Sequence, residues 1–281
     1  MVSREHDPFG SCATSPMAST VTARVHIVSD VHGAVDAVSR AAEGSDFFVC
    51  LGDLILFLDY DDPENGIYAE LFGTEYAKTY IELRTANRFE EAREFSAAAW
   101  EGIGVTSPEQ RWEKLEAKVH EQYARMFAAL PSPSFLTYGN VDVPQLWEQY
   151  LRPGHTVLDG EVVETNGQRW GFLGGGLISP MRTPYELEPD VYAQKLWNMG
   201  PVDVLFTHIP PRHELLNYDT VARRFEVGSS AITDYIRKYK PRYHFFGHVH
   251  QPLKARLRMG ATECINVGHF HGKEKPYIID L

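Results

Sequence analysis

Short apolar runs alternate with amphipathic segments along most of the chain, a pattern typical of an α/β protein. Residues 24–29 predict a strand, residues 30–44 a turn and a helix that ends at Gly44, and residues 46–52 a second strand. This strand–helix–strand order predicts parallel pairing through a right-handed crossover.

The pattern changes between residues 59 and 135, where strand signals almost disappear and helices are predicted over residues 66–85, 88–100 and 108–130. The last helix has Ser107 at its N-cap, Pro108 in its first turn and Gln110 three residues after the cap, which predicts a capping box. Apolar side chains recur at helical spacing and predict one buried face: Trp112, Leu115, Val119, Tyr123, Met126 and Phe127.

Strand patterns return after residue 133. They cover residues 134–140, 162–165, 169–175, 202–208, 242–248, 263–268 and 276–281, with helices near 188–198 and 229–239. We therefore expect a disordered leader over residues 1–23 and a single α/β domain over residues 24–281, with a helical insertion at about 59–133.

Polar side chains that can bind metals follow the predicted strands. They are Asp30, His32, Asp53, Asn140, His208, His248 and His250. Each short motif alone is weak evidence, because Gly-Asp and Gly-Asn pairs are usually turns and D-x-H arises by chance. The carboxyl ends of strands in an α/β sheet meet in one crevice, so the set as a whole favours a metal site.

The series D-x-H, G-D, G-N, H and G-H-x-H resembles the calcineurin-like metallophosphoesterase superfamily, over about residues 24–58 and 135–281. The resemblance implies a four-layer α/β/β/α sandwich that holds two metal ions. By position, Asp30, His32 and His250 would bind one ion, and Asn140, His208 and His248 the other. Asp53 would bridge both ions and hold the bridging hydroxide that attacks phosphorus.

The implied activity is hydrolysis of a phosphomonoester or phosphodiester of a small molecule. Two divalent cations about 3.5–4 Å apart can activate a hydroxide and take up charge on phosphoryl oxygens. Nitrogen and oxygen ligands without thiolate fit Mn, Fe or Zn and do not choose among them. The alternative is a catalytically weak metal-binding sensor or scaffold with the same fold.

One position departs from the resemblance. Many relatives have a histidine after the G-N pair that contacts phosphate and protonates the leaving group, and here it is Val141, followed by Asp142. We expect Asp142 to orient a metal ligand, with simple turn chemistry as the alternative. Candidates for the missing donor are His213, Arg182, His269 and His271, and for His269 a surface loop is the competing interpretation.

The distribution of charge narrows the class of binding partner. The 281 residues carry 27 Lys and Arg against 38 Asp and Glu, and residues 59–135 alone hold 15 acidic and 8 basic residues. The net charge of −11 disfavours nucleic acid, so we expect a small phosphorylated substrate, with the insertion as a possible homo-oligomer interface.

Cysteine content and apolar runs bear on the cellular location. Cys12, Cys50 and Cys264 suggest neither a disulfide framework nor a thiolate zinc site. The longest apolar stretch is too short to span a membrane, and residues 1–20 lack a signal-peptide core. We expect no membrane contact and a cytoplasmic protein.

Overall fold

The computed structural model of the chain describes residues 22–281. The predicted disorder of residues 1–21 lies outside the described residues. The expectation was wrong for Ala23, which is buried and exchanges two backbone hydrogen bonds with Leu281.

Two sheets form the centre of the described structure. The first has the order β15 (Tyr277–Asp280), β1 (Arg24–Val28), β2 (Phe47–Cys50), β3 (Ser134–Leu136) and β4 (His155–Val157). The second has the order β13 (Arg256–Met259), β14 (Thr262–Asn266), β12 (Tyr243–Phe246), β9 (Val204–Thr207), β6 (Gln168–Leu173) and β5 (Glu161–Thr165). The pairs β1–β2 and β9–β12 are parallel, and β15, β13 and β5 join antiparallel at sheet edges.

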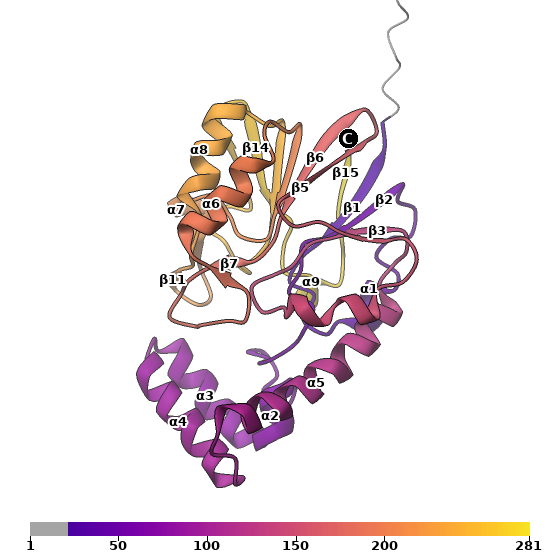
Figure 1. Cartoon of the computed structure of the whole chain (residues 1–281). Coiled ribbons are helices and arrows are strands. Elements are labelled where there is room, and N and C mark those ends of the chain that lie inside the picture. The colour runs from indigo at the N-terminus through magenta and orange to yellow at the C-terminus, as the bar shows by residue number, and fades with distance from the viewer. Residues whose placement is uncertain (1–21) are drawn as a thin grey trace, which may run out of the picture.

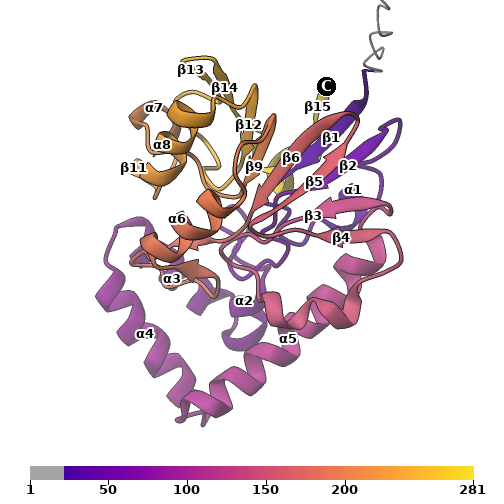
Figure 2. The same cartoon turned by 45° about the horizontal axis from the view of Figure 1, so that its top comes forward.

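Helices cover the outer faces of both sheets (Figure 2). Helices α1 (Val35–Val38) and α5 (Pro108–Ala129) share a core with the first sheet, and α6 (Pro189–Asn198) and α8 (Ser230–Tyr239) share one with the second. A third apolar cluster joins the two sheets, with Val25, Ile27, Trp170, Phe172 and Phe206 among its members. The predicted four-layer α/β/β/α arrangement is confirmed.

The helical insertion lies beyond the carboxyl ends of the strands in both views (Figures 1 and 2). It comprises α2 (Ile67–Phe72), α3 (Thr74–Thr85) and α4 (Phe89–Gly102), after which α5 returns to the first sheet. The predicted capping box of Ser107 and Gln110 is present. Val119, Tyr123, Met126 and Phe127 are buried along α5 as predicted, but Trp112 is 39% exposed, since the first turns of α5 extend away from the sheet.

Two predicted helices have different boundaries. The helix expected to run to Gly44 is α-helical only over Val35–Val38, because the Ser39 hydroxyl donates to the Asp36 carbonyl and later amides bond three residues back. The segment expected as one helix over residues 66–85 divides into α2 and α3 at Gly73, which has a φ of 89°.

Short elements that the hydrophobic pattern did not predict complete the structure. They are β4, β13, β7 (Gly176–Leu177), β8 (Glu186–Leu187), β10 (Tyr218–Asp219), β11 (Arg224–Phe225), α7 (Glu214–Asn217), α9 (Phe270–Lys273) and two 3-10 turns at Pro144–Leu146 and Glu148–Tyr150. Among residues 22–281, no helix combines the length and apolar character needed to cross a membrane.

Candidate metal centre

The seven predicted ligands come from five loops that follow β1, β2, β3, β9 and β12. These strands end at the same edge of the two sheets, on the side where the insertion lies (Figure 1). The structure brings all seven side chains together through a series of short contacts.

Asp53 lies at the centre of the cluster. Its Oδ2 atom is 3.7 Å from His32 Nε2 and 3.4 Å from His208 Nε2, and the Asp53 side chain is 5% exposed. One carboxylate oxygen therefore faces histidines from both predicted metal positions.

Asn140 lies between His208 and a further histidine, His248. Its Oδ1 atom lies 2.8 Å from His208 Nε2 and 2.8 Å from His248 Nδ1. The Asn140 amide nitrogen donates to Thr183 Oγ1 at 3.0 Å, which turns the oxygen toward the two rings. One oxygen and two imidazole nitrogens thus converge on one point.

Asp30 connects the first strand of one sheet to the last histidine loop of the other. Its Oδ1 atom is 3.6 Å from His250 Nε2, and both of its oxygens accept from the backbone amide of His248. The ring of His250 lies 5.4 Å from that of His32, centroid to centroid.

Hydrogen bonds set the tautomers of two histidines. His32 Nδ1 is 2.9 Å from the Ile55 carbonyl, and His208 Nδ1 is 2.9 Å from the Leu51 carbonyl. A carbonyl only accepts, so each Nδ1 carries a proton, and Nε2 is the atom left to bind a metal ion, which at His208 would take the place of the Nε2 proton. This is the arrangement that metal-ligating histidines adopt, so the residues fit a divalent cation.

The backbone of the cluster is strained. Four of the seven residues have left-handed φ angles that side chains with a Cβ rarely adopt: Asp30 (56°), His32 (38°), Asp53 (55°) and His248 (67°). Such strain persists only where surrounding contacts enforce it and is concentrated at functional sites.

The motif glycines allow these loops to touch. A Cβ on Gly139 would lie 2.0 Å from Asp53 Oδ1, and one on Gly247 would lie 2.3 Å from Asp30 Oδ2. Glycine is therefore required sterically in G-N and G-H-x-H, because the predicted ligands occupy the space of its side chain.

Asp142 lies behind the cluster, fully buried, and contacts the loop of Asp53 rather than a histidine. Its carboxylate accepts from the backbone amides of Asp53 at 2.8 Å, Leu54 at 3.0 Å and Gly139 at 2.8 Å. It thereby holds the loop after β2 against the loop after β3.

Burial and mutual charge shift the pKa values of these groups. Burial opposes ionisation of Asp30, but the hydrogen bond and charge of His250 outweigh it and hold the Asp30 pKa well below its usual range. Burial likewise opposes protonation of His208, yet Asp53 and Asp30 raise its pKa to about 9. Burial and the nearby Asp53 charge raise the pKa of Asp142 to about 7.

The structure places the four candidate proton donors in different surroundings. His269 lies beside His32 and His250, with ring centroids 5.7 Å and 3.9 Å away. His271 faces Asp59, with its Nε2 3.3 Å from Asp59 Oδ2. His213 caps α7 by accepting from the Leu215 amide, and Arg182 is exposed in the loop between β7 and β8.

A cavity of about 160 Å³ adjoins the Asn140 side of the cluster. His248 and Asn140 line it together with Asn87 and Phe89 from the α3–α4 junction of the insertion, and with Arg224. The sequence offers Phe89 only as one of several aromatic residues of the insertion, for which packing is the favoured role, and it gives no signal for Asn87. Their approach to the pocket depends on how the insertion folds back over the strand ends.

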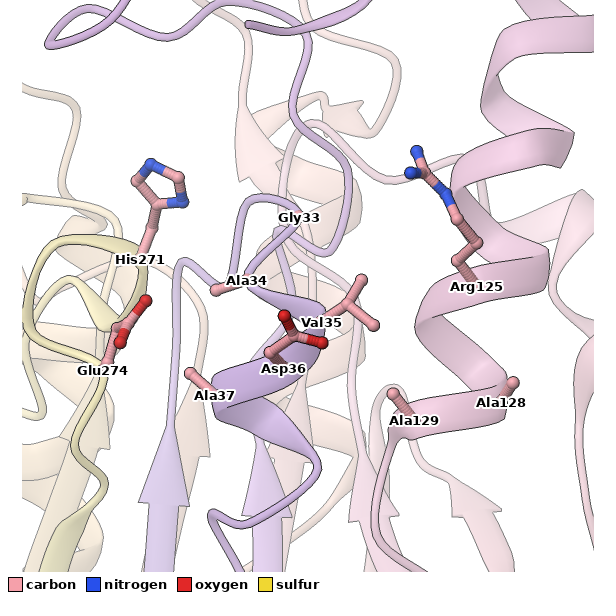
Figure 3. A pocket seen from close by; sticks show the side chains of 10 residues that line it. All are labelled: Gly33, Ala34, Val35, Asp36, Ala37, Arg125, Ala128, Ala129, His271 and Glu274. Carbon is pink, nitrogen blue, oxygen red and sulfur yellow. The ribbon is translucent and has the colours of Figure 1, made fainter.

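A larger cavity of about 790 Å³ lies between α1, α5 and α9 (Figure 3). Alanine side chains of α1 and α5 line it, and the side chains of Arg125 and His271 lie in the upper part of the view, on opposite sides of the cavity. None of the seven predicted ligands lines it, so the smaller cavity is the one that opens onto the cluster.

Residues 101–252, more than half of the chain, match the model of the family described as calcineurin-like phosphoesterase. The chain belongs to this family, which consists generally of metal-dependent phosphoesterases. The matched segment includes Asn140, His208, His248 and His250. Among curated proteins, no sequence matches the chain.

Two solved structures resemble the fold. One aligns with a TM-score of 0.58 at 15% identity and covers 92% of this chain and 99% of its own. The other is the crystal structure of TT1561 of Thermus thermophilus, with a TM-score of 0.50, 13% identity and coverage of 92% of this chain and 99% of its own. At these identities the likeness concerns the fold alone.

Replacing Asp142 tests whether it holds the cluster together. In Asp142→Asn an amide group replaces a carboxylate oxygen that accepts from backbone amides, which leaves buried donors unpaired. We expect the free energy of unfolding to fall by about 2–4 kcal/mol, measured by urea denaturation. The control Asp190→Asn, an exposed carboxylate in the first turn of α6, should change it by less than about 1 kcal/mol. Equal stability of the two variants would contradict this role.

Proposed function

We propose that this protein is a phosphoesterase that uses two divalent metal ions to hydrolyse an ester of a small phosphorylated molecule. The observation that carries the proposal is the convergence of seven ligand atoms from five loops, with Asp53 Oδ2 facing His32 and His208 at once. A structural histidine cluster has no need for a shared central carboxylate.

Two sets of side chains would hold the two ions. Asp30, His32 and His250 form one set, and Asn140, His208 and His248 form the other, with Asp53 common to both. Ligand atoms of Asp30, Asp53 and His208 also lie within 4.8 Å of one another, a spacing that a metal ion can span. Bound ions would polarise a phosphoryl oxygen and lower the pKa of a water molecule.

The protein's own residues orient these groups. Backbone carbonyls hold the His32 and His208 rings with Nε2 inward, Thr183 turns the Asn140 oxygen inward, and Asp142 holds the Asp53 loop. This mixed set of nitrogen and oxygen donors suits Mn, Fe or Zn.

The small cavity beside Asn140 and His248 is the proposed substrate pocket. Phe89 and Phe225 supply aromatic surface, and the Arg224 guanidinium lies 5.9 Å from the centre of the Phe89 ring. A volume of about 160 Å³ accommodates a small organic group. With the overall charge of −11, this supports a small-molecule ester over nucleic acid.

Removal of the central carboxylate provides the main test. After metal removal and reconstitution with Mn, Fe or Zn, the wild type should hydrolyse a generic aryl phosphate ester, and chelation should abolish the activity. Asp53→Asn and His208→Ala should each lower kcat/KM at least about 100-fold. His213→Ala, the same change outside the cluster, should remain within about twofold of wild type.

A wild-type protein that binds two metal ions but hydrolyses no phosphomonoester, phosphodiester or cyclic nucleotide would contradict the proposal. That result would favour the sensor or scaffold with the same fold.

A comparison of ester leaving groups tests whether Val141 leaves the site without a proton donor. Its side chain cannot donate a proton, and its amide is engaged with Asp53 Oδ1 at 2.9 Å. We expect aryl esters to be hydrolysed at least about 100-fold faster than alkyl esters, and Val141→His to narrow that ratio by accelerating the alkyl reaction. Equal rates on both ester classes in the wild type would show that another residue already supplies the proton.

The contribution of the insertion to substrate binding is tested at Phe89. Phe89→Ala removes an aromatic wall of the pocket without touching a predicted ligand. We expect KM for an aryl ester to rise about tenfold, with kcat within about twofold of wild type. Phe95→Ala, a matched change on the same helix at a ring that packs on Tyr76, serves as the control. An unchanged KM in Phe89→Ala would place the substrate elsewhere.

A further inference from the structure

The side chain of Asn140 has an end that accepts hydrogen bonds and an end that only donates them. Its Oδ1 atom can bind a cation, whereas its NH2 group cannot, so a metal centre needs the oxygen on the inside. The nitrogens of His208 and His248 lie 2.8 Å from Oδ1, and on the other side the amide nitrogen donates to Thr183 Oγ1 at 3.0 Å. The choice between the two ends therefore depends on what the Thr183 hydroxyl offers.

The Thr183 hydroxyl is itself fixed by Glu186. Thr183 Oγ1 donates to Glu186 Oε1 at 2.8 Å, and the Thr183 backbone amide donates to the same oxygen at 3.1 Å. A carboxylate oxygen only accepts, so the single hydroxyl proton of Thr183 points at Glu186. Only lone pairs of the hydroxyl then face Asn140, and these accept from its NH2 group and repel its oxygen. Glu186 thereby decides which end of the Asn140 amide faces the histidines.

Further hydrogen bonds hold Glu186 in place. Its Oε1 atom also accepts from Ser179 Oγ at 2.6 Å, and its Oε2 atom accepts from the Ser179 amide at 2.9 Å. Glu186 lies in β8 opposite Gly176 of β7, where an added Cβ would be 2.9 Å from the Cβ of Asn140. The Tyr185 amide donates to the Asn140 carbonyl at 2.9 Å. The backbone and the side chain of Asn140 are thus both tied to the segment that carries Glu186.

We propose that Glu186 is a positioning residue for Asn140 and acts through the Thr183 hydroxyl. The metal position concerned is the one that Asn140 shares with His208 and His248. The inference rests on the proposed function only for the presence of a metal ion at that position. Hydrogen-bonded groups behind a metal ligand fix its orientation, and their loss lowers metal affinity by about 10–100-fold.

Loss of the Glu186 carboxylate frees the Thr183 hydroxyl to rotate. The hydroxyl can then donate to Asn140 Oδ1, which turns the NH2 group of the amide toward the metal position. An ion that binds there must first turn the amide back, so the apparent affinity falls in proportion to the fraction of chains with the oxygen inward. The other metal position does not include Asn140 and keeps its affinity.

Cobalt(II) titration of the metal-free protein tests the proposal without any activity measurement. Wild type, Thr183→Val, Thr183→Ser and Glu186→Ala are titrated by calorimetry and visible absorption. We expect two cobalt ions per wild-type chain and, in Thr183→Val and Glu186→Ala, a loss of at least about tenfold in the affinity of one ion. Thr183→Ser keeps the hydroxyl and should remain within about threefold of wild type. The control Thr79→Val, which removes a hydroxyl that donates to the Glu75 carbonyl within α3, should match wild type.

The double variant Thr183→Val/Glu186→Ala separates positioning from general damage to the fold. If Glu186 acts through Thr183, the double variant should lose no more affinity than the weaker-binding single variant. Additive losses would overturn the proposal, because Glu186 would then act by another route, and so would unchanged cobalt affinity in either single variant. A wild type that binds two cobalt ions yet cleaves no ester refutes the proposed function and leaves the test of Glu186 intact.

Discussion

Buried aromatic and branched side chains of the two sheets pack face to face, and every feature of the candidate metal centre depends on this contact. Val25 and Ile27 of β1 and Phe206 of β9 belong to this layer, and each lies a few residues before a predicted ligand. Because the sheets are pressed together here, the loops that leave their strands meet at one edge. The His208 ring can then donate to the Leu51 carbonyl of the other sheet, and Asp30 can accept from the His248 amide.

The meeting of these loops concentrates strain and charge in a small volume. Left-handed backbone at Asp30, His32, Asp53 and His248 and burial of Asp30 and Asp53 all cost free energy. Hydrogen bonds from backbone amides and contacts with histidines offset part of that cost, and bound cations would offset more. The buried Asp142, whose pKa rises to about 7, belongs to the same balance, because its charge lies close to that of Asp53.

The insertion contributes one part of the pocket beside the candidate metal centre. It extends past the strand ends, and its α3–α4 junction returns to line the cavity with Asn87 and Phe89. Contacts farther along the same helices hold it there: the guanidinium of Arg84 reaches Met181, and that of Arg93 reaches the Pro180 carbonyl. The core residues carry the chemistry that we propose, and the insertion adds Asn87 and Phe89 to a pocket that core loops line for the rest.

The amino-acid sequence by itself determined the order of the strands with buried faces, the insertion and the seven strand-end side chains, since hydrophobic periodicity and ligand type are local properties. It also predicted the capping box of α5, which depends on residues three apart. Edge strands such as β4 and β13 escaped prediction because their sides facing solvent or loops carry little hydrophobic pattern. Only the tertiary structure decided that Asp142 supports the Asp53 loop, that His269 stacks on His250 while His271 pairs with Asp59, and that Phe89 reaches the pocket. Most of these contacts join segments that are far apart in the chain, and the different partners of His269 and His271 depend on the direction of the backbone. Local sequence spacing encodes neither the long-range contact nor the backbone direction.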